Sequence, residues 1–142
     1  MHEHWTEEAA DVALLILSRM KELGKPIIQI CGPMSTGGLG DLSQNMKRFQ
    51  KAIDIATERG LTVFNQIPFQ EAIVRLSRPG ESDEYCMETL EIFYRRIFES
   101  GHISKTLFLS GWDGSTGATW ERNLVCKLRI EVEEYPTEWL QI

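Results

Sequence analysis

The feature of this sequence that most constrains its fold is a regular alternation of short apolar runs with longer segments of helical spacing. The apolar runs have the length of buried strands and lie at residues 27–31, 61–64, 106–109 and 128–132. Helices are expected at residues 6–23, 41–59, 69–76 and 115–127, with another long helix that begins at 82. Strands that alternate with helices predict parallel βαβ units, and therefore an open α/β sheet with helices on both faces.

Residues with known capping preferences mark several of these helix ends. Thr6, Asp41 and Ser82 each precede a helical segment and can accept a hydrogen bond from its first turn, and Gly24 ends the first helix. At 142 residues the chain is expected to form a single domain. We divide it into an N-terminal helix (1–26), an α/β domain (27–134) and a C-terminal tail (135–142).

The charge of the chain limits the classes of partner. The formal net charge is −6, whereas a surface that binds nucleic acid needs clustered lysine and arginine. We therefore expect no nucleic-acid polymer as a partner, although backbone amides can still bind one small phosphate group. The apolar run at 12–17 is too short to span a membrane, and no cleavable leader is evident. We expect a cytoplasmic protein with no membrane partner.

The cysteines do not form a recognisable disulfide or metal pattern. Cys31, Cys86 and Cys126 are odd in number and lack the spacing of a Cys-x-x-Cys motif. We expect reduced thiols in the core, and no metal site.

The search for chemistry can be confined to three loops, because ligands of open parallel sheets bind beyond the carboxyl ends of the strands. These loops span residues 32–41, 65–70 and 110–117. The first is rich in glycine, as phosphate-binding loops are. A nucleoside triphosphate P-loop, however, needs a lysine and a hydroxyl residue after its second fixed glycine, and here Gly37 is followed by Gly38 and Leu39. This loop is therefore not predicted to bind a triphosphate.

The third loop carries the strongest chemical signal, in the stretch Ser-Gly-Trp-Asp-Gly-Ser-Thr-Gly-Ala-Thr-Trp-Glu-Arg (110–122). Free amides at the start of a helix, with the Ser115 hydroxyl beside them, make an anion site. Glu121 follows one to two turns into the same helix. Such a carboxylate can attack the anomeric carbon of a sugar whose 5′ end lies on the amides. The alternative is that Glu121 is a surface residue of an amphipathic helix.

Three motifs together resemble one family. They are Gly-Pro-Met at 32–34, Gly-Trp at 111–112 and Ser-x-Gly-Ala-x-x-Glu at 115–121. This combination is similar to the nucleoside 2-deoxyribosyltransferase-like superfamily, over roughly residues 27–132. It is closest to an uncharacterised branch of that superfamily with a Gly-Pro-Met loop and a Gly-Trp-x-x-Ser-x-Gly-Ala segment. The resemblance implies a Rossmann-like (flavodoxin-like) α/β fold and a homodimer or higher oligomer. It also implies an N-glycosidase or deoxyribosyltransferase that uses no metal or organic cofactor.

The resemblance also implies roles for individual residues. Glu121 matches the nucleophilic glutamate. Ser115 stands where related nucleotide hydrolases have a serine that donates to a 5′-phosphate. The expected small-molecule partner is a nucleotide or nucleoside, and Ser115 favours a nucleoside monophosphate. The remaining residues expected to bind substrate or phosphate are Gly32, Pro33, Met34, Ser35, Gly37, Gly38, Gly111, Trp112, Asp113 and Gly117.

The chain departs from the family pattern at three positions. An acidic residue that assists sugar and base protonation is replaced by Arg96, a second acidic residue by Ser104, and a tyrosine of the first strand by Gln29. Asp113 or Glu71 could supply the missing acid. These losses leave open an alternative function, a catalytically weakened pocket that binds a nucleotide as a sensor or regulatory module. A third possibility is a small interaction protein whose glycines serve only turns.

Three further interpretations are left to the structure. The segment 94–96 could contact a phosphate or form salt bridges along a helix, and Trp112 could stack on a base or belong to the core. The first helix is apolar on more than one side around 12–17. A single small sheet cannot cover such a helix, so we expect it to lie in an interface between subunits.

Overall fold

The structure is a computed structural model of the chain, and it describes residues 2–33, 42–76 and 83–141. Within these ranges, the side chains of residues 2–5, 42, 73–76 and 83–90 are not described. The expected caps Asp41 and Ser82 therefore lie outside the described residues.

Four parallel strands form one sheet, as the sequence predicts. Their order across the sheet is β2-β1-β3-β4. The strands are β1 (Ile27–Cys31), β2 (Thr62–Val63), β3 (Lys105–Phe108) and β4 (Glu131–Glu134). The predicted α/β fold, a Rossmann-like open parallel sheet, is thus confirmed.

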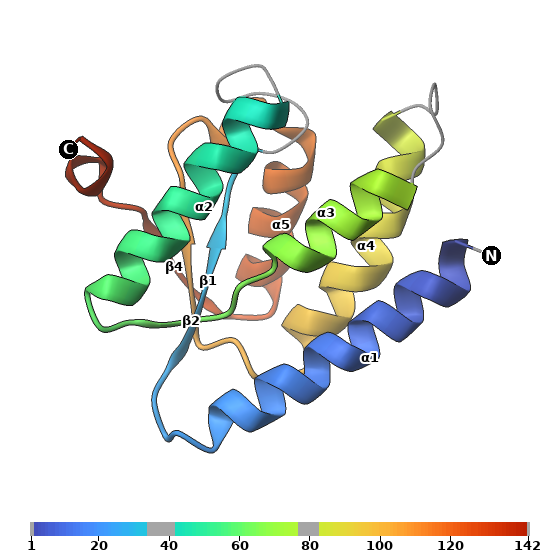
Figure 1. Cartoon of the computed structure of the whole chain (residues 1–142), viewed down its shortest axis with the longest axis horizontal. Coiled ribbons are helices and arrows are strands. Elements are labelled where there is room, and N and C mark those ends of the chain that lie inside the picture. Colours follow the sequence, from blue (N-terminus) through green and yellow to red (C-terminus); the bar gives the residue numbers. More distant parts are fainter. Residues whose placement is uncertain (1, 34–41, 77–82, 142) are drawn as a thin grey trace.

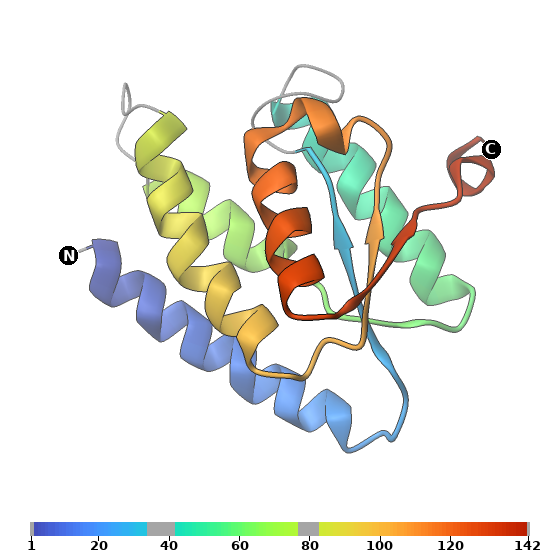
Figure 2. The ribbon, with the colours of Figure 1, turned by 180° about the vertical axis from the view of Figure 1, so that it is seen from behind.

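Helices cover both faces of this sheet (Figures 1 and 2). In Figure 1, α2 lies in front of the strands and α5 lies behind them. Figure 2 shows α4 and α1 to the left of α5. The helices are α1 (His2–Lys21), α2 (Leu42–Glu58), α3 (Ile67–Leu76), α4 (Asp83–Glu99) and α5 (Thr116–Lys127), with short 3-10 helices η1 (Trp112–Gly114) and η2 (Thr137–Leu140).

The alternation of side chains along β1 divides the core in two. Ile27 and Cys31 join a cluster with residues of α1, α4 and α5, whereas Ile28 and Ile30 join a cluster with α2. All five residues of β1 are buried. A strand covered on both faces by helices needs this continuous apolar composition, which is why the sequence identified β1 so clearly.

The order of the strands reverses between β1 and β3. From β1 the chain passes through α2 to the edge strand β2, and it then returns through α3 and α4 to β3 on the other side of β1. The carboxyl ends of β1 and β3 stay together, because the Leu109 N–H donates to the Cys31 carbonyl at 2.8 Å. Ligands of open α/β sheets bind beside such a reversal, so the search for a site begins beyond Cys31 and Phe108.

Two helices begin earlier than expected. The first helix starts at His2, so Thr6 lies within it and is fully buried rather than acting as its cap. α3 starts at Ile67, two residues before the expected Phe69, because the Asn65 side chain accepts a hydrogen bond from the Ile67 N–H at 3.0 Å. Asparagine is a favoured capping residue.

The last strand is displaced from the expected 128–132 to β4 at 131–134. The apolar residues that suggested an earlier start of the strand lie at the end of α5. Leu128 is the C-terminal cap of this helix, and the next residue, Arg129, has a positive φ of 61°. The Ile130 N–H then donates to the Val125 carbonyl at 3.0 Å, which closes the helix before the strand begins.

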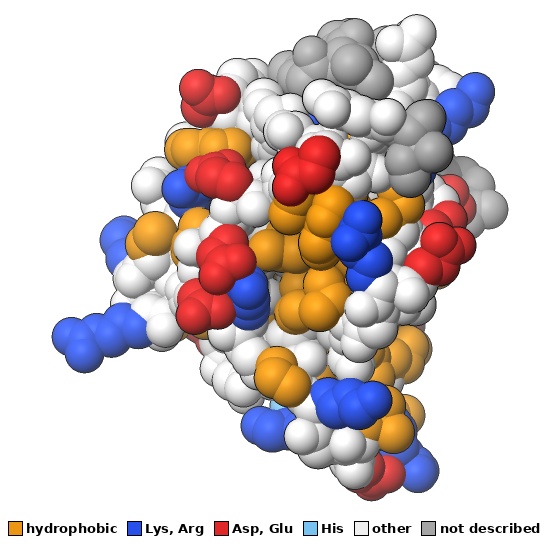
Figure 3. All heavy atoms as spheres, turned by 90° about the vertical axis from the view of Figure 1, so that its left-hand side faces the viewer, with side chains coloured by type: hydrophobic (Ala, Val, Ile, Leu, Met, Phe, Trp, Pro, Cys, Tyr) orange, Lys and Arg blue, Asp and Glu red, His pale blue; other side chains and the backbone are white. Residues whose placement is uncertain are grey.

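The expected C-terminal tail packs against α2. The Tyr135 hydroxyl donates to the Ala52 carbonyl at 2.9 Å, and the Arg59 guanidinium lies over the Trp139 ring at 4.4 Å. Figure 3 views the molecule from this side and shows hydrophobic side chains gathered in the middle of the face, with acidic and basic side chains around them.

One side of α1 is buried and the opposite side is exposed, and both sides carry apolar residues. Ala10, Ala13 and Leu17 are fully buried, whereas Val12 and Leu15 are 52% and 61% exposed. No helix in the described part of the chain is long and apolar enough to cross a membrane.

We predict that Gly32→Ala destabilises the protein by about 1–3 kcal/mol, because the added methyl group overpacks the centre of the core. A Cβ at position 32 would lie 2.8 Å from the Leu109 Cβ. The matched control is Gly114→Ala, since a Cβ there has no neighbouring heavy atom within 4 Å. Urea unfolding measures both variants, and equal midpoints would contradict this account of Gly32.

A candidate site at the carboxyl edge of the sheet

Part of the predicted site lies in the first loop. Met34, Ser35, Gly37 and Gly38 fall outside the described residues. Gly32 and Pro33 are described, and both are buried. The space that a side chain at position 32 would need is filled by Leu109, so this glycine permits the close approach of two strand ends.

The loop after β3 makes a tight left-handed turn into α5. Gly111 has φ 87°, a conformation that favours glycine, and it begins η1. Trp112 is partly buried and packs against the core, with its ring edge-on to Phe108 at 5.9 Å. The Arg122 guanidinium lies over the same indole at 4.1 Å and pairs with Glu134 at 2.9 Å. Trp112 is therefore a core residue, and a base could stack only on the ring face away from Arg122.

Ser115 caps α5, whereas the sequence left the cap open between Ser115 and Thr116. Its hydroxyl oxygen accepts a hydrogen bond from the Ala118 N–H at 3.2 Å, and the residue is 4% exposed. The hydroxyl hydrogen remains able to donate. The N–H groups of Thr116 and Gly117 have no hydrogen-bond acceptor among the described residues. Asp113 is exposed directly before this helix start.

Glu121 lies at the carboxyl end of β1. Its carboxyl group lies close enough to the thiol of Cys31, the last residue of that strand, for each group to affect the pKa of the other. The residue is partly exposed, whereas Cys31 is fully buried. Desolvation raises the pKa of Glu121 to about 8, and the nearby Cys31 thiol partly offsets this rise. At pH 7 the protonated form of this carboxyl is therefore favoured.

Tyr94 from α4 completes this buried group. It is 4% exposed, and its hydroxyl donates to the Gln70 side-chain oxygen at 2.9 Å. Burial is the main cause that raises its pKa, and the charges of Glu121 and Cys31 add to the rise. The same causes, burial first and then Glu121, raise the pKa of the Cys31 thiol. The three ionisable side chains of β1, α4 and α5 thus lie close enough to influence one another.

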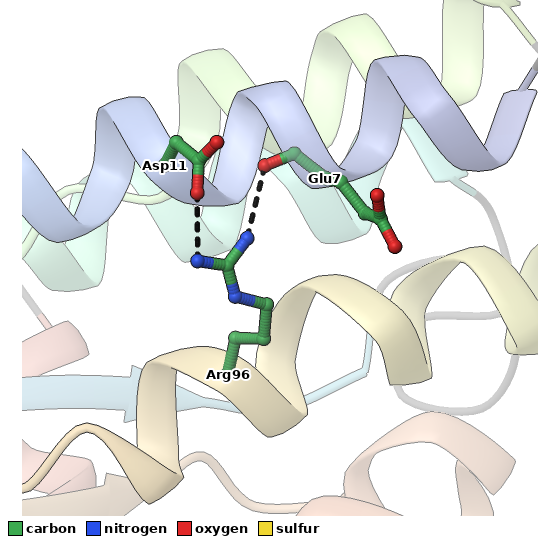
Figure 4. A network of polar contacts seen from close by, with 3 residues as sticks. All are labelled: Glu7, Asp11 and Arg96. Atoms are coloured by element: carbon green, nitrogen blue, oxygen red, sulfur yellow. Dashed lines mark hydrogen bonds and ion pairs between the residues drawn. The ribbon is translucent and has the colours of Figure 1, made fainter.

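The three positions that depart from the family pattern do not supply a replacement acid. Arg96 turns toward α1, where it donates to the Asp11 carboxylate at 2.7 Å and the Glu7 carbonyl at 3.1 Å (Figure 4). It joins two helices rather than binding a phosphate. Ser104 precedes β3, at the amino edge of the sheet, opposite the candidate site. Gln29 is fully buried, and both of its side-chain polar atoms lack a partner among the described residues.

One residue of this edge escaped the sequence analysis. Arg48 of α2 donates from one terminal nitrogen to the Ser110 carbonyl and hydroxyl oxygens, both at 2.7 Å. Desolvation lowers its pKa, and the described residues give it no acidic partner. No signal in the sequence distinguishes it from other basic residues on helices, because its contact with Ser110 joins residues 62 positions apart.

The remaining polar groups do not suggest a metal centre. No group of three or more His, Cys, Asp or Glu side chains could hold a metal ion within the described ranges. Cys31 and Cys126 are free thiols, the first buried and the second exposed. Glu71, one of the two acids considered as a proton donor, is exposed on α3.

Comparison of the chain with family models, with curated proteins and with solved structures found no match in any of the three. The resemblance to the deoxyribosyltransferase-like superfamily therefore rests on the three sequence motifs alone.

We predict that Glu121 makes the protein less stable as the pH rises from about 4.5 to 8. In this window the unfolded carboxyl has lost its proton while the folded one keeps it. The free energy of unfolding then falls by at most about 1.4 kcal/mol per pH unit. Glu121→Gln removes this contribution, so its stability relative to the wild type should increase with pH.

Urea unfolding between pH 5 and pH 8 measures the difference in free energy of unfolding between Glu121→Gln and the wild type. Groups that titrate alike in both proteins contribute nothing to this difference. Glu58→Gln, a change at an exposed position of α2, should keep the pH dependence of the wild type. A Glu121→Gln variant that is offset from the wild type by the same amount at every pH would show that this carboxyl ionises normally.

Proposed function

We propose that this chain cleaves the N-glycosidic bond of a nucleoside 5′-monophosphate or a related nucleotide, with Glu121 as the nucleophile. The observation that carries the proposal is the environment of this carboxyl group. It is desolvated but partly exposed, and it lies at the carboxyl edge of β1 on the helix that Ser115 caps. A surface glutamate of an amphipathic helix has no such environment.

The spacing along α5 supports a sugar phosphate as the ligand. Glu121 lies six positions after Ser115, which corresponds to about 9 Å along a helix axis. A phosphate on the free amides of the first turn would leave the anomeric carbon of its sugar within reach of Glu121. Arg48, a cation without an acidic partner in the described part of the chain, reaches the same loop through Ser110 and suits an anionic ligand.

In the proposed reaction, a Glu121 carboxylate oxygen bonds to the anomeric carbon as the carbon–nitrogen bond breaks. The base leaves with the electron pair and takes a proton from water or from Asp113, the exposed acid beside the start of α5. Water then cleaves the glycosyl ester in a hydrolase, or a second base accepts the sugar in a transferase.

The alternative function is a nucleotide-binding sensor or regulatory module. Two observations favour it: Glu121 is mostly protonated at neutral pH, and Arg96 is engaged with α1 instead of supplying an acid. A panel of nucleotides and nucleosides, assayed for free base and for thermal stabilisation, separates the two functions. Release of base supports the enzyme, whereas stabilisation without release supports the sensor.

For the enzyme, we predict that Glu121→Gln lowers the rate of base release at least 1,000-fold while nucleotide binding stays within a few-fold of the wild type. The amide retains the size of the side chain but cannot act as an anionic nucleophile. In the wild type, kcat/KM should rise about tenfold per pH unit below pH 8 and level off above it, because only the ionised carboxyl reacts.

Base release by chromatography and nucleotide binding by calorimetry provide these measurements, with Glu58→Gln as the control. A folded Glu121→Gln protein that releases base at the wild-type rate would rule out this mechanism. A kcat/KM that falls as the pH rises through 8 would assign Glu121 to acid catalysis instead.

We also infer that α1 forms an interface between two copies of the chain. Val12, Leu15 and Ile16 are 52%, 61% and 41% exposed, and their spacing places them on one side of the helix. Contiguous apolar surface of this kind marks sites of protein association.

We therefore predict that light scattering at micromolar concentration gives twice the chain mass of 16.3 kDa. Leu15→Arg should shift this mass to that of the monomer, because it places a charge in the middle of the apolar strip. The control is Leu128→Arg, at an exposed leucine on another part of the surface. A wild type that remains monomeric would contradict the interface.

A further inference from the structure

We infer that Arg48 is the residue that makes this site selective for a phosphorylated ligand: its guanidinium donates to the phosphate group, while Ser110 holds the side chain in place. This inference deepens the proposed function, and it rests on that function for the nucleotide to which the phosphate belongs. It assigns phosphate recognition to a side chain of α2, a helix that none of the three sequence motifs includes.

The contact with Ser110 places Arg48 at the carboxyl edge of the sheet. Ser110 comes directly after Leu109, whose N–H donates to the Cys31 carbonyl at the end of β1. It also comes directly before Gly111, where the chain turns toward the start of α5. Figures 1 and 2 show that α2 and α5 both begin at this edge. A group bound by Arg48 would therefore lie beside the loop that leads into α5.

Ser110 engages only one nitrogen of the guanidinium. That terminal nitrogen donates to both the carbonyl and the hydroxyl oxygen of Ser110, each at 2.7 Å. A guanidinium carries further N–H donors on Nε and on its other terminal nitrogen. These donors have no protein acceptor in the described part of the chain. Arg48 is thus held at one end of its guanidinium and keeps its remaining donors for a ligand.

The other partly buried arginines among the described residues differ from Arg48 in their partners. Arg96 pairs with the Asp11 carboxylate at 2.7 Å. Arg122 pairs with the Glu134 carboxylate at 2.9 Å. Arg48 is also partly buried, and desolvation lowers its pKa, but its printed partners are neutral oxygens. A cation that loses hydration without a carboxylate to pair with is suited to an anion that binds from outside.

A phosphate monoester is the anion that suits this edge. It presents several acceptor oxygens, so one of them can accept from Arg48 while another accepts from the N–H groups of the first turn of α5. A free nucleoside has a neutral hydroxyl in the same place and would leave the cation without a counter-charge. Discrimination between the two ligands should therefore depend on Arg48.

The first test uses inorganic phosphate, which needs neither a base nor a glycosidic bond. The nitrogen–proton NMR signal of the Arg48 Nε–H, assigned through bonds and by its absence in Arg48→Gln, should shift and saturate as phosphate is added at constant ionic strength. Arg48→Gln should weaken phosphate binding, followed through the backbone amides of α5, by about ten- to a hundredfold. The matched control is Lys51→Gln, which removes an exposed cation of the same helix and should change the affinity by less than about twofold.

The second test measures selectivity by calorimetry, with each nucleoside 5′-monophosphate of a panel compared with its own nucleoside. Arg48→Gln should weaken binding of the monophosphate by about tenfold or more and leave that of the nucleoside within about twofold. Arg48→Lys, which keeps the charge but offers fewer donors, should lie between Arg48→Gln and the wild type. An arginine that only holds the loop at Ser110 in place would change both affinities by the same factor, and that result would overturn the inference.

The outcomes separate this inference from the proposed function. If phosphate binding depends on Arg48 but no nucleotide releases its base, the anion contact is correct and the proposed reaction fails. If base is released while Arg48→Gln keeps its preference for monophosphates, the reaction stands and the role of Arg48 is wrong. A wild type without a saturable phosphate shift would also overturn the inference. Should Arg48→Gln not fold, the wild type decides alone: an Arg48 Nε–H signal that phosphate does not move would contradict the inference.

Discussion

The parallel pairing of β1 with β3 is the interaction on which the rest of this structure depends. It places two strand ends, Cys31 and Phe108, side by side and determines which helices can cover each face. The pairing continues past the strands through the bond from Leu109 to the Cys31 carbonyl, and it requires a residue without a side chain at position 32. The loops that form the candidate site begin where this pairing ends, so their starting geometry is fixed by the core.

The candidate site places an ionisable group in an environment that opposes its charge. Glu121 has lost part of its hydration, and the neighbouring Cys31 thiol offsets only part of the resulting rise in its pKa. Such an arrangement lowers the stability of the folded protein at neutral pH. Ionisable groups with strongly shifted pKa values are commonly found at functional sites. The nearby cation Arg48 is likewise desolvated and interacts with neutral oxygens instead of a carboxylate. An anionic ligand would compensate the cation, and a cationic transition state would compensate the ionised Glu121.

Much of this architecture could be predicted from local patterns. β1 was recognisable because both of its faces are buried, and the start of α5 because Ser115 and Thr116 are both residues that cap helices. The start of β4 was misjudged, since apolar residues that end a helix resemble residues that begin a strand. The contact between Cys31 and Glu121 had no local signal, because it joins residues 90 positions apart in the sequence. The same reason hid the role of Arg96, whose partner lies on a different helix.

The two edges of the sheet are protected in different ways. β2 has only two residues, so it offers almost no backbone for another strand to extend. β4 carries Glu131, Glu133 and Glu134, and its neighbour Lys105 pairs with the first two of them at 3.8 and 2.7 Å. An approaching strand would meet carboxylates at one edge and a truncated ladder at the other. Amyloid-like pairing of sheet edges between molecules is therefore disfavoured. This protection matters because the centre of the sheet contains some of the most β-prone residues in the chain.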